Sequence, residues 1–488
     1  MKLYNTLSKK VETFHSLSEL DAKSENPKTV SLYACGPTVY DFTHIGHLRK
    51  YVMDDILVRL LRHADYEVKH VQNITDVGHL SSDEDEGEDK MEKGARKYGQ
   101  SAFDIAKKFE DYFFYSMDLM GIMRPTVSCR ATDHVQSQLE LVLDLEKKGL
   151  TYVIDGDGVY FDTSKLDAYG QLSGHDPRHA ELNSRVAEVS RKRNPTDFAL
   201  WKFEQVGEHR QMVWPSPWHP RSFPGWHVEC SAMSIEHLGP QLDIHTGGID
   251  HIAVHHANEI AQSESFTGKK PFAKFWVHHN FLRVDGEKMS KSLGNFFTID
   301  DILAKGFAPQ ALRLLFLQSH YRSEQNFTWD SLAAAAKSLS KLQAAYLACR
   351  QDKDGSDSES SQQNLFDQLH SEFFTQLEND LHTSEALAVV WKLLKTDLSA
   401  KLKLRLLVEF DSVLGFGLTA LTDQAKTYRP DDLPPVVQEL FKQRERARQN
   451  KDWAKSDQLR QEIEEAGFIL LDHQDQVEIR PVKSNKSL

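Results

Sequence analysis

The chain has 488 residues, of which 40% are hydrophobic, and its formal net charge is −13. This length is more than one hydrophobic core supports, so we expect three or four domains, and the negative charge argues against nonspecific nucleic-acid binding while leaving room for local basic patches. Four widely spaced cysteines do not form a disulfide framework and indicate a reducing compartment.

The sequence lacks the hydrophobic segments of a membrane or secreted protein. No apolar run reaches the length of about 18 residues that spans a membrane. The first residues, Met1–Asn5, contain no apolar core of a signal peptide. We therefore expect a cytoplasmic protein with no membrane contact.

The first part of the chain predicts a parallel strand–loop–helix–strand unit. Residues 30–34 form a short apolar run, a helical pattern covers 52–61, and a second strand follows at 67–72. Such right-handed units bind ligands at the carboxyl ends of their strands. The acidic run 81–88 is predicted to be a solvated loop.

An insertion is predicted to interrupt this parallel sheet. Amphipathic helices are expected at 102–119 and 136–148, and the Gly-rich segment 152–161 has the alternation of a hairpin. The sheet resumes near 242–245. From Trp329 the sequence becomes helical, with a polar loop at 352–363 and a second break at 429–435. The remainder predicts two helices and two short strands, at 436–448, 452–466, 468–471 and 477–479.

A candidate metal site lies around the segment 246–259. In a helix over 254–264, His255 and Glu259 lie one turn apart on one face, which is metal-ligand spacing. Two glycines and Asp250 just before the helix indicate a turn that brings backbone close to a ligand. Cys35 and Cys230 could supply further ligands. An ordinary solvated His–Glu pair is the alternative.

Two further segments carry groups suited to phosphate. His44 and His47, separated by Ile45–Gly46, stand at a helix start, where free amides and the positive dipole end favour anions, and Gly46 would let a purine approach the backbone. Lys288 and Lys291 lie three residues apart in a polar loop and could follow developing phosphate charge. Two solvated histidines and a basic surface loop are the alternatives.

Together these segments resemble the two signatures of the class I aminoacyl-tRNA synthetases, which stand here at 44–47 and 288–292. Within that class the chain is similar to the cysteinyl-tRNA synthetases almost end to end. The segments that carry the likeness are 33–40, 194–202, 225–233 and 255–263. The sequence departs from the commoner pattern at Ala253–Val254, at Ala257 and at His279–Phe281, none of which is a proposed ligand.

The resemblance implies an α/β fold: a Rossmann-like parallel-sheet catalytic domain with an insertion, then an α-helical bundle and a small α+β C-terminal domain. We expect the following boundaries: 1–120 for the first half of the catalytic domain, 121–225 for the connective insertion, 226–285 for the second half with the metal site, 286–328 for the second-signature loop and stem-contact region, 329–428 for the helical bundle, and 429–488 for the anticodon-binding domain.

The resemblance also implies functional residues. One zinc ion would be bound by Cys35, Cys230, His255 and Glu259. ATP and its transition state would be served by His44, Gly46, His47, Lys288 and Lys291, with Mg²⁺ accompanying ATP. The amino acid would contact Thr75, Trp226 and Asp250.

The implied activity is ATP-dependent activation of L-cysteine and its transfer to tRNA(Cys) by a monomer. Shape alone separates cysteine from serine only about 10 to 200-fold, whereas a zinc–thiolate bond discriminates sulfur from oxygen. Four protein ligands would fill a tetrahedral shell. We therefore expect Glu259 to coordinate weakly, or the ion to become five-coordinate with substrate.

The C-terminal unit carries basic residues beside an aromatic, Arg444–Arg448 and Lys451–Trp453, which could contact unpaired bases. An exposed charged helix with Trp453 packed on its partner is the alternative. Two rival functions remain: a ligase of the same fold that joins cysteine to an amino sugar, and a non-catalytic RNA-binding protein derived from a synthetase.

Overall fold

The structure is a computed structural model that describes residues 1–78, 89–174, 191–290, 293–352, 359–421, 430, 433–450, 452–466, 468–472 and 477–481. The chain divides into two compact units, Met1–Phe416 and Gly417–Leu488. Our finer division of the first unit into domains stays a prediction. Among the described residues, no helix has the length and apolar character needed to cross a membrane.

A five-stranded parallel sheet forms the centre of the first unit. Its strands are β3 (Thr29–Ala34), β4 (Glu67–Ile74), β5 (Val127–Arg130), β10 (Leu242–Gly248) and β11 (Ala273–His279), in the order β11-β10-β3-β4-β5. The chain runs outward from β3 through β4 to β5, then returns to β10 on the other side of β3. This reversal is a topological switch point, where open parallel sheets bind ligands.

Helices connect these strands. The predicted helix at 52–61 is the middle of α2 (Ile45–His63), which joins β3 to β4, and the predicted helix at 102–119 has the bounds of α4 (Ala102–Leu119). The others are α3 (Lys90–Tyr98), α5 (Val135–Lys147), α6 (Trp226–Leu238) and α7 (His255–Thr267). The predicted Rossmann-like parallel sheet is therefore confirmed.

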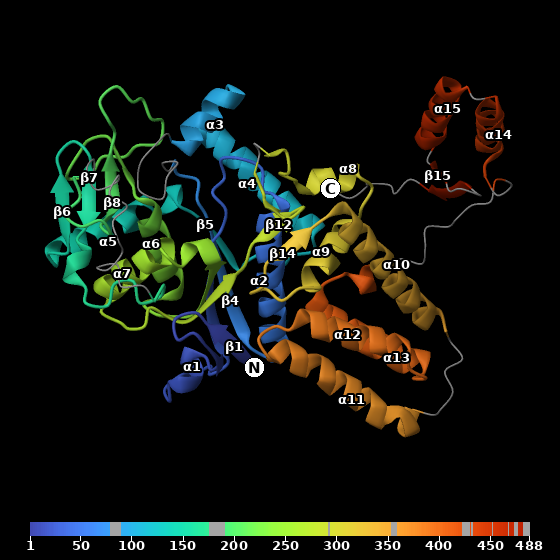
Figure 1. Ribbon diagram of the computed structural model, residues 1–488, viewed down its shortest axis with the longest axis horizontal. Helices are drawn as coiled ribbons and strands as arrows, with labels where there is room; N and C mark the ends of the chain where they lie inside the picture. Colours follow the sequence, from blue (N-terminus) through green and yellow to red (C-terminus); the bar gives the residue numbers. More distant parts are fainter. Residues whose placement is uncertain are drawn as a thin grey trace. The chain divides into compact units, whose positions relative to one another are not determined.

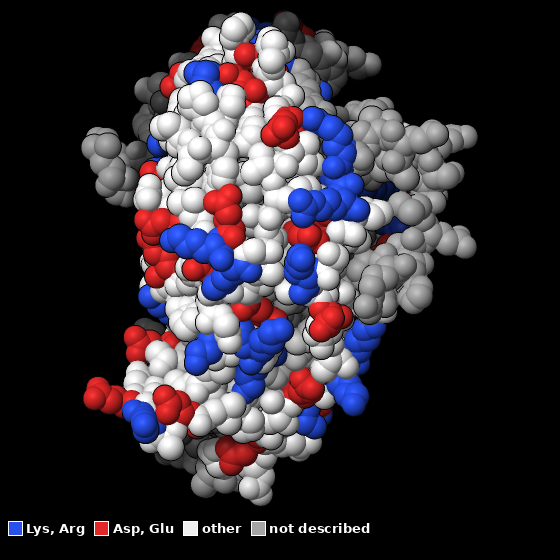
Figure 2. All heavy atoms as spheres, turned by 90° about the vertical axis from the view of Figure 1, so that its left-hand side faces the viewer, with Lys and Arg blue, Asp and Glu red and all other residues white. Residues whose placement is uncertain are grey.

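The insertion is a four-stranded antiparallel sheet in the order β6-β7-β8-β9. Its strands are β6 (Thr151–Ile154), β7 (Gly158–Phe161), β8 (Phe198–Phe203) and β9 (Ser222–Pro224). Buried aromatic and aliphatic side chains of β7 and β8, including Phe161 and Trp201, pack against Leu141 and Leu145 of α5. Figure 2 shows Lys and Arg intermingled with Asp and Glu over the insertion side of the molecule, without a broad area of one sign.

The rest of the first unit begins with a small sheet, β13-β12-β14, made of β12 (Leu282–Val284), β13 (Glu287–Lys288) and β14 (Gln325–Phe327). The helices that follow β13 are α8 (Ile299–Ala304), α9 (Pro309–Leu317), α10 (Trp329–Gln351), α11 (Glu359–Glu378), α12 (Thr383–Leu394) and α13 (Ala400–Leu414). Figure 1 shows α10 to α13 and the insertion strands on opposite sides of the parallel sheet. A hairpin of β1 (Lys2–Asn5) and β2 (Lys10–Thr13) and the short α1 (Leu17–Leu20) precede β3.

The second unit contains α14 (Pro435–Gln449), α15 (Trp453–Glu465) and an antiparallel pair, β15 (Phe468–Asp472) and β16 (Val477–Pro481). Its core includes Val437, Phe441, Ile463, Leu470 and Ile479. These elements match the predicted two helices and two strands.

Two local predictions were wrong. Residues 359–363 begin α11 instead of continuing a polar loop, because the helix buries Leu369, Phe373 and Leu377 farther along its length. Gly247 and Gly248 are the last residues of β10 instead of a turn. The acidic run 81–88 lies outside the described residues.

Candidate active site

The four predicted metal ligands meet beside the switch point of the parallel sheet. Cys35 directly follows β3, Cys230 lies on α6, and His255 and Glu259 lie one turn apart on α7. Their sulfur, nitrogen and oxygen donor atoms all lie within 4.8 Å of one another, and all four residues are buried. The residues around them are part of an apolar core that includes Tyr33, Met233 and Trp276. These donors therefore lie in a low-dielectric setting that water enters poorly.

Neighbouring histidines orient the His255 and Glu259 side chains. His255 places Nε2 at 3.0 Å from Oε1 of Glu259, while its Nδ1 lies 2.9 Å from Nδ1 of His227. The other carboxylate oxygen, Oε2, lies 2.8 Å from Nε2 of His245. Partners behind the donor atoms fix tautomer and ring direction, as is usual around metal sites. Nε2 of His255 and Oε1 of Glu259 are thus the atoms that face the two thiols.

A second group of donors overlaps the first. Cys35, His245, His256 and Glu259 also hold donor atoms within 4.8 Å of one another. Nε2 of His256 lies 3.2 Å from the Cys35 sulfur, and its Nδ1 lies 2.8 Å from Nε2 of His278. The sequence interpretation did not assign His245 or His256. The density of histidines between residues 227 and 279 was the signal that could have found them.

The electrostatics of this pocket favour one cation. Burial, followed by the influence of other histidines, lowers the pKa of His251, His256 and His278 well below the ordinary value. His255 differs: burial opposes its charge, but Glu259 and Cys230 outweigh burial and raise its pKa to about 10. Burial would raise the pKa of Glu259, yet His245 and His255 hold it well below its usual range. Without a metal, the ionised carboxylate therefore pairs with a protonated His255, and a bound metal ion would take the place of that proton.

The donor chemistry fits zinc. Two sulfurs, an imidazole nitrogen and a carboxylate oxygen form the soft and borderline set that this ion prefers. A hydrogen bond with Cys35 and then burial raise the pKa of the Cys230 thiol well above its ordinary value, so these thiols are inert until a cation draws off their protons. The residues that are present thus fit a bound zinc ion.

Glycines at the end of β10 allow close packing around this site. A Cβ atom on Gly247 would lie 2.4 Å from Cε1 of His256, and one on Gly248 would lie 2.2 Å from Oδ1 of Asp250. These strand residues therefore pack closely against neighbouring side chains, and the predicted approach of backbone to a ligand stays a prediction. Asp250, in the short helix Ile249–His251, is exposed.

The other predicted amino-acid contacts lie at neighbouring positions. Trp226 is the first residue of α6, half-buried, with its ring centroid 4.5 Å from that of His255. Thr75 directly follows β4, is buried, and donates its hydroxyl hydrogen to Glu229 at 3.2 Å. Trp226 thus lies beside the proposed metal ligand His255. Thr75, just after β4, contacts Glu229 of α6.

The first predicted phosphate segment is a helix start. His44 is the N-cap of α2, and its Nδ1 accepts a hydrogen bond from the backbone N–H of His47 at 3.3 Å. The two imidazole rings stack with centroids 3.6 Å apart. A Cβ atom on Gly46 would lie 3.0 Å from the His44 ring and 3.5 Å from Cε of Met289. Gly46 therefore keeps the space open between the first signature and the second.

The surroundings of both histidines disfavour their charged forms. Burial and then His47 lower the pKa of His44 well below its ordinary value. Surrounding protein and then Lys50 lower the pKa of His47 to about 4, even though part of its ring reaches solvent. Before a phosphate binds, both rings therefore favour the neutral form, in which an imidazole still offers one N–H donor.

The second predicted phosphate segment is more open. Lys288 ends β13 and is exposed. After it, the side chain of Asn295 accepts from the Ser290 N–H at 2.7 Å and donates to the Lys288 carbonyl at 3.2 Å. A backbone hydrogen bond from Ile45 to Phe297, 2.9 Å long, joins this loop to the start of α2. Lys291 lies outside the described residues.

In the second unit, Trp453 is 59% exposed and Arg444 is 1% exposed. The exposed indole is open for stacking, contrary to the alternative in which it packs against the partner helix. Arg444 is buried and cannot reach a base. Lys451 lies outside the described residues.

Comparisons with known proteins agree with this arrangement. Residues 21–337 match the family described as the tRNA synthetases class I (C) catalytic domain, and residues 430–480 match the cysteinyl-tRNA ligase anticodon binding domain. The methionyl-tRNA synthetase of Mycobacterium tuberculosis, solved with methionyl-adenylate, has 18% identity and a TM-score of 0.54 over 79% of this chain and 89% of that chain. A leucyl enzyme, the Agrobacterium radiobacter LeuRS in a ternary complex, has 14% identity and a TM-score of 0.58, covering 84% and 87% of the two chains. The switch-point sheet and the catalytic-domain match define a class I aminoacyl-tRNA synthetase.

Sequence relatives narrow the family. Cysteine–tRNA ligase 1 of Burkholderia lata is 43% identical over 475 residues, which cover 97% of this chain and 95% of the relative. The cysteine–tRNA ligase of Zymomonas mobilis subsp. mobilis is 41% identical over 504 aligned positions, covering 96% and 95%. The chain therefore belongs to the cysteine–tRNA ligase family.

Proposed function

We propose that this protein activates L-cysteine with ATP, using Mg²⁺, and transfers the cysteinyl group to tRNA(Cys), with one zinc ion per chain held by Cys35, Cys230, His255 and Glu259. The buried meeting of two thiols, an imidazole and a carboxylate at the switch point carries this proposal. The full-length likeness to cysteine–tRNA ligases supports the reaction.

The overlapping donor group serves better as support than as the ligand set. In it, His245 is stacked on Trp276 with centroids 4.5 Å apart and contacts the outer oxygen of Glu259. His256 is held between Cys35 and His278. Both rings therefore brace ligands, and only the first of these two groups contains two thiols, those of Cys35 and Cys230. Zinc held by the first group would supply a direct bond to the substrate thiolate, which a serine hydroxyl forms poorly.

Trp226 completes the amino-acid pocket in this proposal. Its indole is adjacent to His255 and half-buried, so it can cover the side chain of a small amino acid and exclude water. Asp250 is exposed in the short helix that precedes α7, and its carboxylate is proposed to bind the substrate ammonium. A buried metal and a closed apolar wall together give selectivity without a second, editing site.

The chain needs no nucleophile of its own for the activation step. The substrate carboxylate attacks the α-phosphorus of ATP, and pyrophosphate leaves. His44 and His47 contribute neutral N–H donors at the positive end of α2, where charge develops on phosphoryl oxygens. The exposed Lys288 adds positive charge, and the family likeness assigns the same role to Lys291.

We further propose that residues 429–488 read the anticodon, residues 286–328 contact the tRNA stem, and the chain acts as a monomer. The family match over residues 430–480 supports the first assignment, and exposed Trp453 is the side chain best placed to stack on a base.

The test is cysteine-dependent pyrophosphate exchange, with serine as the control, followed by charging of purified tRNA(Cys). We expect exchange with cysteine and transfer to the tRNA. Exchange without charging would indicate the amino-sugar ligase, and absence of both would indicate a non-catalytic RNA-binding protein. Either outcome overturns the proposal.

A further inference from the structure

A buried lysine joins the helix of the first signature to the backbone of a proposed metal ligand. Lys50 is one turn beyond His47 on α2, and its side chain is only 12% exposed. Its Nζ donates to the backbone carbonyl of Cys35 at 2.7 Å and pairs with Oδ2 of Asp54 at 2.8 Å. The ammonium also lies 4.6 Å from the centroid of the Tyr51 ring. The helix that carries the first signature thus holds the residue that directly follows β3.

Asp54 is itself fixed from another strand. Its Oδ1 lies 2.9 Å from Nε2 of His279, the last residue of β11, and its side chain is 2% exposed. Burial opposes the charge of this carboxyl, but Lys50 and His279 outweigh burial and hold its pKa well below its usual range. Asp54 is therefore a permanent anion that keeps the Lys50 ammonium in place. His279 belongs to the segment in which the sequence departs from the commoner family pattern.

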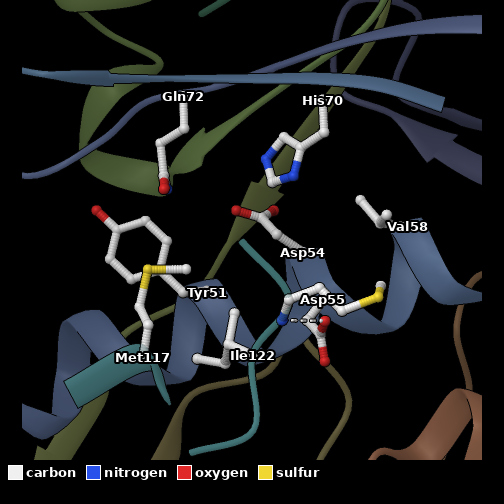
Figure 3. Close-up of a pocket in the computed structure, with 9 residues that line it drawn as sticks. Tyr51, Asp54, Asp55, Val58, His70, Gln72, Met117 and Ile122 are labelled. Carbon is white, nitrogen blue, oxygen red and sulfur yellow. Dashed lines mark hydrogen bonds between the residues drawn. The ribbon is translucent and has the colours of Figure 1, made fainter. Parts of the chain in front are cut away.

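The region behind Asp54 is a small closed space. Figure 3 shows the Asp54 carboxylate directed from α2 toward His70 on β4, with Gln72 and Tyr51 beside it. These side chains are buried. Asp54 is thus shielded from solvent on this side. Its attraction to Lys50 and His279 is therefore screened less than it would be in water.

The peptide group between Cys35 and Gly36 is held at both of its polar atoms. The Lys50 ammonium donates a hydrogen bond to the Cys35 carbonyl oxygen. The Gly36 N–H donates to Oδ1 of Asn73 at 2.7 Å. A Cβ on Gly36 would lie 1.6 Å from the Asn73 carbonyl oxygen, so the backbone cannot shift toward β4. Fixing this peptide plane fixes the direction in which the Cys35 side chain leaves the backbone.

We infer that Lys50 is a positioning residue of the metal centre: anchored by Asp54 and His279, it holds the Cys35 carbonyl and so aims the Cys35 sulfur at the other three donors. This inference rests on the proposed role of Cys35 as a zinc ligand. A buried lysine–aspartate pair gains little stability by itself. The pair does, however, contact the backbone of a proposed metal ligand. Residues that hold metal ligands in place influence the affinity of a site for its metal.

The test compares Lys50→Met with Lys107→Met. Lys107 also pairs with an aspartate one turn away, Asp111, but on an exposed helix face. Zinc affinity is measured by competition with a chelator, and KM is measured separately for cysteine and ATP. We expect K50M to weaken zinc binding about 10 to 100-fold and to raise the KM for cysteine, while the KM for ATP and all K107M values stay at wild-type levels.

Two further variants protect the test against misfolding. Lys50→Arg keeps a positive donor and is expected to restore most of the zinc affinity lost in K50M. Asp54→Asn keeps the size of the side chain and is expected to weaken zinc binding in the same direction, with K50M/D54N no weaker than K50M alone. Circular dichroism and melting temperature confirm folding of each variant.

The inference is overturned if folded K50M or D54N binds zinc as tightly as the wild type, or if K50M raises the KM for ATP and cysteine equally. These outcomes are separate from the failure of the proposed function. If the wild type shows no cysteine-dependent exchange, the proposed function fails, whereas the zinc competition still decides the role of Lys50.

Discussion

The metal centre and the two phosphate-binding signatures differ in how firmly the fold holds them. The four proposed zinc ligands are buried, and neighbouring histidines fix His255 and Glu259. Lys288, by contrast, ends a two-residue strand and is exposed, and His47 reaches solvent. Under the proposed function, recognition of the amino acid is therefore built into the core, whereas activation relies on more exposed side chains.

Cys230→Ser should have the largest effect because it removes one of two thiols from the rigid region. We expect loss of bound zinc and a large rise in the KM for cysteine. Preference for cysteine over serine should fall to what shape alone provides, about 10 to 200-fold. Metal analysis and exchange kinetics with both amino acids measure this. Retained zinc with unchanged preference would show that the core does not carry recognition.

His47→Ala should impair the phosphate-binding region and leave the metal centre unchanged. Removing one preorganised donor is expected to lower the kcat of pyrophosphate exchange about 10² to 10³-fold, because the ring stabilises charge on phosphoryl oxygens. Zinc content should not change, since His47 is not a donor of either buried group. A fall in zinc content together with kcat would contradict the independence of the two regions.

Trp453→Ala should leave both regions untouched. Loss of one stacked base is worth about 1 to 3 kcal/mol, so the KM for tRNA is expected to rise about 5 to 160-fold. Pyrophosphate exchange, which needs no tRNA, should keep its wild-type rate. Arg444→Met, which changes a buried side chain of the same unit, serves as the comparison for simple destabilisation. Unchanged tRNA binding in W453A would exclude the stacking role.

Lys288→Ala should have a smaller effect than His47→Ala. An exposed, flexible charge contributes up to about 1 kcal/mol, so we expect exchange to slow by about fivefold or less. Lys288→Arg should retain most of the rate, because the charge remains. A loss as large as that of H47A would mean that Lys288 is held more firmly than its exposure indicates.

The smallest expected effect is that of pH on His47. Its pKa of about 4 lies below the ordinary value of 6.5. The free enzyme should therefore show no His47 protonation between pH 8 and about pH 5. Because the unfolded chain binds that proton near pH 6.5, the contribution of His47 to stability falls as pH drops from 6.5 toward 4. NMR titration of the ring measures this, and a midpoint near 6.5 would contradict it.

The sequence predicted the elements with strong local patterns and missed those that depend on distant contacts. The helix 102–119 was predicted to the residue because apolar positions recur along it and Ser101 caps it. Residues 359–363 look like a loop by composition, but the packing of α11 makes them helical. The spacing of His255 and Glu259 was visible in the sequence. Contacts such as Asp54 with His279, 225 positions apart, have no local signal.

The most direct test of zinc-based recognition uses protein loaded with Co²⁺ in place of zinc. Two cysteine ligands should give a thiolate-to-metal absorption band. Adding L-cysteine should strengthen this band by about half, because a third thiolate joins two, while L-serine should leave it unchanged. If saturating cysteine, shown to be bound by exchange kinetics, leaves the band as serine does, then the metal does not select the substrate by its sulfur and the account is wrong.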